Sequence, residues 1–356
     1  MLNQVLSGDF PRSRLLSVLL VVIFLYLGTA PFLFSGVRPI NVAATTCVFI
    51  VLVTSFDLLL GYCGVVSFAH AMFYGIGAYG LAIAISRMGA TWSAIALGTL
   101  GAVAVSVVAA LLIALISLRV KAIFYSMMTL AISAAFGALV TRMSDITGGD
   151  DGLNFRLPES LTPGFRFFDH DIFATTVNGK VAIYYIIFLS TMTLVFAMLR
   201  IVNSRFGRVM TAIRENEFRA EAIGYHALTY RVTVNCVAAA IATCGGVLMA
   251  LWLQYVGPQS IVGFDVVLNI LLMAVIGGLG TIYGPIVGVA LFVIAENYLQ
   301  SLMTSLAPSL ASHVLIARLF DPDRWLLWFG IAFVLSVYFF PSGIVGKLRA
   351  SKRGLL

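Results

Sequence analysis

Three ionisable residues interrupt long apolar stretches of this chain, namely Asp57, His70 and Glu296. A charged group at the centre of a bilayer costs at least about 2.5 kcal/mol unless it is paired or hydrated, so such residues often carry protons or ions. Each position also has an ordinary explanation. Asp57 stands four residues before Gly61, where it could reach headgroup water, and His70 lies in an aromatic stretch where a packing role is common. Glu296 begins the polar sequence ENYLQ, which fits a helix end or a contact with another subunit.

Two apolar segments in opposite halves of the chain are rich in glycine: residues 61–80 and residues 277–288, the second with Pro285 inside it. Paired interruptions of this kind are typical of transport pathways, because a broken helix exposes backbone groups that can face a polar cavity. The second segment also contains overlapping GxxxG spacings from Gly280 to Gly288, which are typical of close helix packing. Both interpretations stay open.

The remaining candidate motifs point away from enzymes. A GxGxxG string from Gly75 to Gly80 lies in an apolar run, and no Asp or Glu occurs between Asp57 and Asp145, so we expect helix packing and no dinucleotide site. No GxxxxGK[ST], HExxH or CxxC sequence is present. The sequence therefore predicts no catalytic residues, no bound metal and no disulfide framework.

The segment from Arg200 to Arg231 contains six arginines and three glutamates. Residues Val209 to Ile223 are good or tolerable helix formers, and Gly224 is placed to end that helix. Glu217 and Glu221 are like charges four residues apart, an arrangement that favours a cationic partner outside the chain. An amphipathic helix on the inner leaflet is the alternative.

These residues must be positioned by membrane-spanning helices. The chain has 356 residues, of which 61% are hydrophobic and 10% charged, whereas soluble domains have about 25% charged residues. The net charge of +7 is scattered in short clusters, so no nucleic-acid-binding face is expected. We predict an all-α, polytopic transmembrane bundle of about ten helices, each crossing using about 20 apolar residues. The predicted runs are 15–34, 41–60, 66–85, 92–118, 123–141, 181–199, 232–256, 266–276, 286–302 and 325–340.

Charge placement predicts the orientation of the bundle, because Lys and Arg near span ends are retained in the cytoplasm. We expect residues 1–14 to be a cytoplasmic tail, 15–341 the transmembrane domain, and 342–356 a basic cytoplasmic tail. Within the domain, the acidic stretch 142–180 is expected outside, in the periplasm, and the Arg-rich loop 200–231 inside. Ten crossings satisfy this arrangement.

Five segments together give the chain a resemblance to a known family. They read GYCGVVSFAHAMFYGIGAYG from Gly61, LRVKAIFYSMMTLA from Leu118, TGGDDGL from Thr147, SRFGRVMTAIRENEFRAEAIGY from Ser204 and GGLGTIYGPIVG from Gly277. In this order they resemble the membrane permease subunits of branched-chain amino acid ABC importers, over most of the chain. The resemblance implies a bacterial inner-membrane protein, multi-pass, that is not itself an enzyme. It implies a heterodimer with a second related permease, two ATPase subunits that hold ATP and Mg, and a periplasmic substrate-binding protein.

The resemblance also implies roles for particular residues. The Arg-rich loop would couple to the ATPase through Arg208, Ala212, Ile213, Arg214, Glu215, Asn216, Glu221, Ala222 and Gly224. Candidates for the translocation path are Asp57, Ser67, His70, Phe73, Tyr74, Thr129, Gly278, Gly280 and Pro285.

The substrate and the energy source have alternatives. Ala69, Ala122 and Asp57 differ from the family pattern near the path, and members of the wider family handle leucine-type amino acids, other amino acids, urea or short amides. A self-sufficient transporter driven by an ion gradient is the other hypothesis, with Asp57, His70 or Glu296 as the coupling group.

Overall fold

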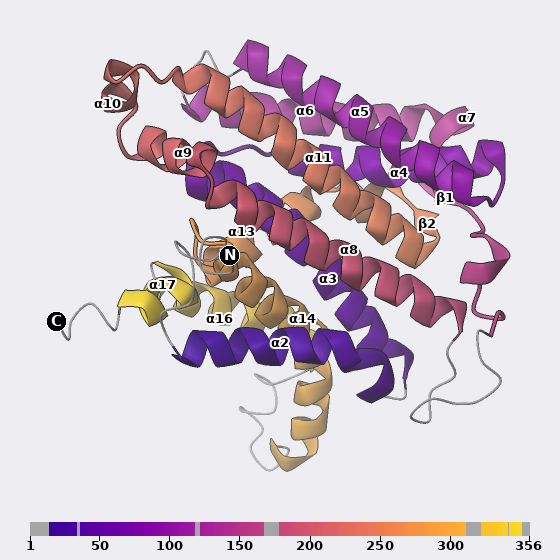
Figure 1. The fold of residues 1–356 in the computed structure, drawn as a ribbon. Coiled ribbons are helices and arrows are strands. Elements are labelled where there is room, and N and C mark those ends of the chain that lie inside the picture. Colours follow the sequence, from indigo (N-terminus) through magenta and orange to yellow (C-terminus); the bar gives the residue numbers. More distant parts are fainter. Residues whose placement is uncertain are drawn as a thin grey trace.

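The protein is a bundle of long helices, and in the part of the chain that the structure describes ten helical segments are long and apolar enough to cross a membrane. The computed structural model describes residues 14–33, 36–117, 122–166, 178–310, 322–340 and 342–350. Most of these helices run lengthwise, so the bundle has two distinct ends (Figure 1). The predicted all-α, polytopic fold is confirmed.

The described helices and strands follow one another along the chain in this order. The first half contains α2 (Arg14–Leu33), α3 (Val37–Asp57), the π-helix η1 (Leu58–Cys63), α4 (His70–Met88), α5 (Trp92–Ser117), α6 (Ala122–Arg142), α7 (Ser144–Thr147), η2 (Gly149–Asp151), β1 (Leu153–Asn154) and η3 (Glu159–Leu161). The second half contains α8 (Gly179–Val202), α9 (Arg205–Glu215), α10 (Glu217–Ala222), α11 (Ala227–Leu253), β2 (Tyr255–Val256), α12 (Pro258–Ile261), α13 (Phe264–Gly277), α14 (Tyr283–Leu310), η4 (Pro322–Arg324), α16 (Trp325–Phe339) and α17 (Gly343–Ala350).

Helices α3 and α11 form the centre of the bundle. Among 18 consecutive residues of each span, 89% are buried in α3–η1 and 72% in α11, whereas 28% are buried in α5 and 12% in the span that contains α16. Helix α11 packs on α3, α4 and α5, while α3 also packs on α8, α13 and α14. The peripheral helices turn large apolar side chains outward, among them Leu100, Leu112 and Leu326, as expected for surfaces that face lipid.

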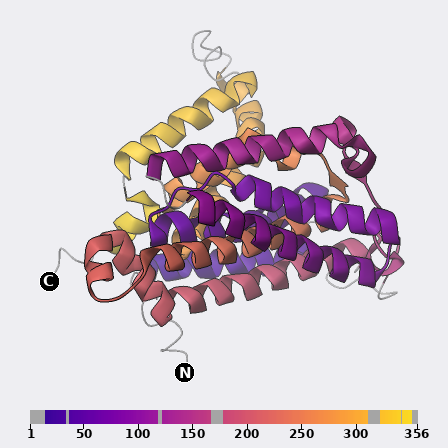
Figure 2. The ribbon, with the colours of Figure 1, turned by 90° about the horizontal axis from the view of Figure 1, so that it is seen from above.

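The two ends of the bundle carry different structures. At one end β1 pairs antiparallel with β2, Leu153 opposite Val256 and Asn154 opposite Tyr255. Helices α9 and α10 lie at the opposite end, and the view from above shows the same separation (Figures 1 and 2). Helix α9 at this second end contacts η1, which follows α3. It also contacts Gly280, in the connection between α13 and α14.

The predicted spans all correspond to helices, with two differences. The third span begins at His70 rather than near residue 66, because residues 64–67 have no regular structure. The short run predicted at 266–276 is part of a longer span, since α12 precedes α13 and the two together cover Pro258–Gly277. Residues 1–13 of the predicted N-terminal tail, residues 351–356 of the predicted C-terminal tail and residues 167–177 of the acidic stretch lie outside the described residues. The rest of the predicted C-terminal tail includes α17, which packs on α13 and α14.

The GxGxxG string in α4 is a packing surface, as predicted. A Cβ on Gly77 would collide with the backbone carbonyl of Thr243 in α11, and a Cβ on Gly246 would collide with the backbone of Tyr74. Gly80 similarly approaches Ala102 of α5. Small residues at these positions let three helices approach closely.

Replacing Gly77 with Val should lower the thermal unfolding temperature of the detergent-solubilised protein, because overpacking a tight contact costs about 1–3 kcal/mol. The same replacement at Gly101 is the control, since a Cβ there meets no atom within 4 Å. Equal melting temperatures for the two variants would contradict the packing assigned to Gly77.

Candidate functional site

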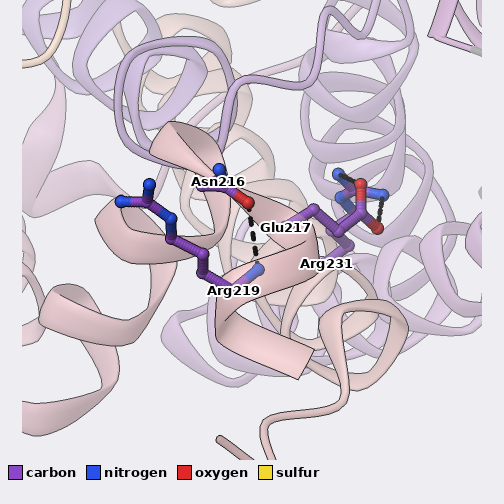
Figure 3. Close-up of polar contacts among 4 residues, drawn as sticks. All are labelled: Asn216, Glu217, Arg219 and Arg231. Carbon is purple, nitrogen blue, oxygen red and sulfur yellow. Dashed lines mark hydrogen bonds and ion pairs between the residues drawn. The ribbon is translucent and has the colours of Figure 1, made fainter. Parts of the chain in front are cut away.

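The Arg-rich segment forms two short helices rather than the single helix predicted from Val209 to Ile223. Asn216 has extended backbone angles, φ −159° and ψ 98°, and separates α9 from α10. Its side-chain oxygen accepts a hydrogen bond from the backbone N–H of Arg219 at 2.9 Å (Figure 3). An asparagine that caps a new helix competes with continuation of the preceding one, which explains the break. Gly224, φ +94°, follows the end of α10 as predicted.

The acidic face predicted for this segment is partly neutralised within the chain. Glu217 accepts two hydrogen bonds from the guanidinium of Arg231, both at 2.9 Å (Figure 3). The prediction that Glu217 awaits an external cation is therefore wrong, because Arg231 at the start of α11 supplies the charge. Glu221 is exposed and has no ion-pair partner among the described residues.

One face of α9 and α10 is anchored to the bundle. Val209, Ile213, Ala220 and Ala227 form a small buried cluster against Tyr230. Ile213, predicted to touch the ATPase, is only 2% exposed. Its position in the cluster indicates that it holds α9 in place instead.

The other face is open and partly apolar. Phe218 is 82% exposed and Ile223 72% exposed. Most of the predicted coupling residues are exposed as well, namely Arg208, Ala212, Glu215, Asn216, Glu221, Ala222 and Gly224. Phe218 was not among the predicted residues, although a lone aromatic in the charged run RENEFRAEA was a usable signal. Large apolar side chains left exposed to water, here a Phe and an Ile five residues apart in the sequence, are typical of a protein–protein contact.

Arg214 is also exposed, but its guanidinium turns toward the bundle. Its Nη1 donates a hydrogen bond to the backbone carbonyl oxygen of Gly61. The same nitrogen lies 2.9 Å from the position that a Cβ on Gly280 would occupy. Arg214 therefore contacts both glycine-rich segments identified in the sequence.

Those two glycine-rich segments meet at Asp57. The Asp57 carboxylate oxygens accept hydrogen bonds from the backbone N–H of Gly280 at 3.0 and 3.1 Å. Nearby, the Tyr62 hydroxyl accepts one from the N–H of Ile282 at 3.1 Å. Asp57 is 0% exposed, so the alternative that it reaches headgroup water is wrong.

The second glycine-rich segment shows both features that its sequence suggested, a break in the helix and a close contact between helices. Residues Gly278 to Ile282 are non-helical, with φ of +109° at Gly278 and +79° at Gly280. Further along, Gly284 and Gly288 in α14 pack against the backbone of α13 and of the break that follows it. Pro285 is buried in the first turn of α14. The segment is thus a break followed by a close helix contact.

The other path candidates lie around the connection between η1 and α4. The backbone N–H of Phe68 donates to the Thr129 hydroxyl at 3.1 Å, and the Ser67 hydroxyl accepts from the N–H of Ala69 at 3.4 Å. His70 is buried between the rings of Phe56 and Phe73, with centroid distances of 5.2 and 6.2 Å. These contacts support a packing role for His70.

All the path candidates are largely enclosed by the chain. Ser67, His70, Phe73, Tyr74 and Thr129 are buried, as are Asp57, Gly278 and Pro285, and Gly280 is partly buried. The structure brings Asp57, Gly278 and Gly280 together near Arg214 and places most of the others along the η1–α4 connection, α4 and α6. The candidates therefore fall into two groups.

Glu296 is neither at a helix end nor enclosed. It lies within α14, which runs from Tyr283 to Leu310, and its side chain is exposed. The helix-end alternative is therefore wrong. The subunit-contact alternative stays open.

Comparison with protein families identifies the group to which the chain belongs. Residues 38–320 match the family described as the branched-chain amino acid transport system permease component. The matched range contains both glycine-rich segments and α9–α10. The chain belongs to this permease family.

Three relatives illustrate the similarity within this permease family. The chain is 28% identical over 170 residues, 47% of each chain, to the probable branched-chain amino acid transport permease protein LivM of Methanocaldococcus jannaschii. It is 24% and 25% identical over 309 residues to the high-affinity branched-chain amino acid transport system permease proteins LivM of Salmonella typhimurium and Escherichia coli K12. Those alignments cover 83% of this chain and 70% of each relative. The aligned part thus spans about half the length of the archaeal relative. No solved structure matches the chain significantly.

The family match confirms two of the sequence predictions. The resemblance that we based on five short segments is confirmed, and so is the prediction of a multi-pass transport protein. The relatives are named as permease proteins, which are transport components rather than enzymes.

Proposed function

We propose that this permease is the membrane subunit of an ATP-driven importer of branched-chain or related amino acids. Its partners are a second, related permease, two ATPase subunits and a periplasmic substrate-binding protein. ATP and Mg bind on the ATPase subunits, and this chain holds no cofactor. The family description and the name of the Salmonella relative both refer to branched-chain amino acid transport, which supports this substrate class.

The observation that carries the proposal is the open face of α9 and α10. An exposed Phe218 and Ile223, with the exposed charges of Glu215 and Glu221, are joined to a buried face that anchors both helices. A surface of this kind suits a soluble subunit that must pull or push on the membrane domain. The contact residues we assign to the ATPase are Phe218, Ile223, Arg208, Ala212, Glu215, Asn216, Glu221, Ala222 and Gly224.

The orientation follows from the charges. Residues 200–231 carry six arginines against three glutamates, and the tail from Ser342 carries four basic residues and no acid. The positive-inside rule assigns both to the cytoplasm. This assignment puts α9 and α10 on the cytoplasmic side, where the ATPase subunits would bind. The acidic stretch 142–180 is then on the periplasmic side, with the binding protein. We assign the protein to the inner membrane, with both tails cytoplasmic.

Uptake by the chain alone tests the proposal against the ion-driven alternative. In proteoliposomes containing only this chain we expect no uptake of labelled leucine, with or without a proton or sodium gradient. Uptake should require the sister permease, the ATPase subunits, the binding protein and ATP. Gradient-driven uptake by the single chain would overturn the proposal. Parallel assays with urea and a short amide test the substrate class.

Replacing Asp57 with Asn separates the two energy sources more sharply. Asn keeps an oxygen that can accept the hydrogen bond from Gly280 N–H, so an ATP-driven importer should retain most of its uptake. An ion-coupled carrier that protonates Asp57 should lose transport. The measurement is the initial rate of ATP-dependent leucine uptake by the assembled complex, and loss of that rate in the Asn variant would count against the importer.

A further inference from the structure

Arg214 and Asp57 are both bonded to the contact between Gly61 and Gly280. Arg214 Nη1 donates to the carbonyl of Gly61 and borders Gly280, while the Asp57 carboxylate accepts from the N–H of Gly280. A Cβ on Gly61 would overlap both Asp57 Oδ1 and the nitrogen of Gly280. The two glycine backbones are therefore in direct contact, with a cation and an anion bonded to them.

This contact joins three distant parts of the chain. Gly61 is 153 residues from Arg214, and Asp57 is 223 residues from Gly280. Gly61 belongs to η1 at the end of the α3 span, and Gly280 to the break between α13 and α14. Arg214 is therefore bonded to the end of the α3 span and lies against the break between α13 and α14.

Both points depart from regular α-helix. Segment η1 is a π-helix, a form that is often found at functional sites because it departs from regular helix geometry. The 278–282 break depends on positive φ angles at Gly278 and Gly280, and the N–H groups of Gly280 and Ile282 are bonded to side chains of α3 and η1 rather than within a helix. Ile213, the residue next to Arg214, packs α9 against Ala227 and Tyr230 of α11.

We propose that Arg214 is a positioning residue that transmits movement of α9 to both glycine-rich segments through Gly61, Gly280 and Asp57. We call these four residues the arginine link. The proposal rests on the proposed function and goes beyond it, because it removes Arg214 from the docking surface and assigns it to the step after docking. The arginine link connects ATPase movement to the membrane spans, and Phe218 and its neighbours make the docking contact.

The test uses the complete importer and compares docking with coupling. In Arg214→Ala we expect the ATPase subunits to co-purify as in the wild type and basal ATP hydrolysis to persist. The number of leucine molecules imported per ATP hydrolysed should fall about tenfold, a loss within the usual range of coupling between sites. Arg205→Ala is the matched control, since Arg205 is exposed on the same helix. It should change neither the co-purification of the ATPase nor the number of leucine molecules imported per ATP.

Variants of Asp57 test the other side of the arginine link. Asp57→Leu removes the acceptor for Gly280 N–H and should reproduce the transport loss of Arg214→Ala. Asp57→Asn keeps an acceptor and should retain most transport. Arg214→Lys, which keeps a donor and a charge, should give an intermediate ratio and guards against misfolding of the alanine variant.

A measurement on the wild-type complex needs no variant to fold. Amide hydrogen exchange over residues 278–283 should change on ATP binding, because the N–H groups of Gly280 and Ile282 are bonded to Asp57 and Tyr62. This change should be reduced, though not abolished, in Arg214→Lys. An unchanged exchange rate in the wild type would overturn the arginine link.

The outcomes separate the arginine link from the proposed function. A wild-type ratio of transport to hydrolysis in Arg214→Ala would overturn the link and leave the importer intact. Loss of ATPase co-purification in Arg214→Ala would make Arg214 a docking residue and would also overturn the link. Failure of the wild-type chain to bind any ATPase would overturn the proposed function itself.

Discussion

Phe218→Asp is expected to abolish ATP-dependent uptake while leaving the chain inserted in the membrane. The Phe218 side chain is 82% exposed on α10, near exposed Ile223, so the change disturbs no internal packing. Aromatic residues at the centre of an interface commonly contribute at least about 2 kcal/mol, and a buried carboxylate adds a desolvation cost. Binding of the ATPase should therefore weaken at least about 30-fold.

Co-purification of the ATPase with the tagged chain measures this effect directly. Phe218→Leu is the matched control, because it keeps an apolar side chain at the same position and should retain most binding. Glu221→Lys, a charge reversal on the same open face, should weaken binding as well. Normal ATPase binding in Phe218→Asp would remove the docking assignment of this face.

Gly61→Ala should abolish or strongly reduce uptake for a different reason. The added methyl group would occupy the space of Asp57 Oδ1 and the Gly280 nitrogen, so the two segments must separate and the hydrogen bonds to Asp57 must lengthen. Overpacking of this kind costs about 1–3 kcal/mol. The variant should bind the ATPase normally but import little substrate per ATP, in contrast to Phe218→Asp.

A matched glycine in open space provides the control for Gly61→Ala. A methyl group added to Gly330 in α16 would meet no atom within 4 Å, so Gly330→Ala should transport like the wild type. Unchanged transport in Gly61→Ala would contradict the close contact between Gly61 and Gly280, and with it the arginine link.

The membrane spans could be predicted from the sequence because a spanning helix leaves a long apolar run that needs no knowledge of its neighbours. The Gly61–Gly280 contact could not be predicted in the same way. Its residues lie 219 positions apart by their numbers, and only the packing of α3 against α13 and α14 brings them together. The glycine content of the sequence identified both segments but did not indicate that they contact each other.

The Arg-rich segment shows where local patterns fail. Helix-forming residues on both sides of Asn216 favour one continuous helix, but the Asn216 side chain caps a second one. The partner of Glu217, Arg231, is 14 residues away, beyond the reach of a helical spacing rule. The direction of Arg214 depends on the position of Gly61 in space, which no periodicity encodes. Burial of Ile213 in the cluster with Ala227 likewise needs α11 to be in place.

The most direct test of the central claim is to tag this chain in its native membrane, extract it gently and identify the proteins that co-purify, then assay uptake by the purified assembly. We expect a second permease and an ATPase to be recovered with it, and leucine uptake that requires both ATP and the binding protein. A chain that is recovered alone, and that transports alone on an ion gradient, would contradict the account and return attention to Asp57, His70 and Glu296.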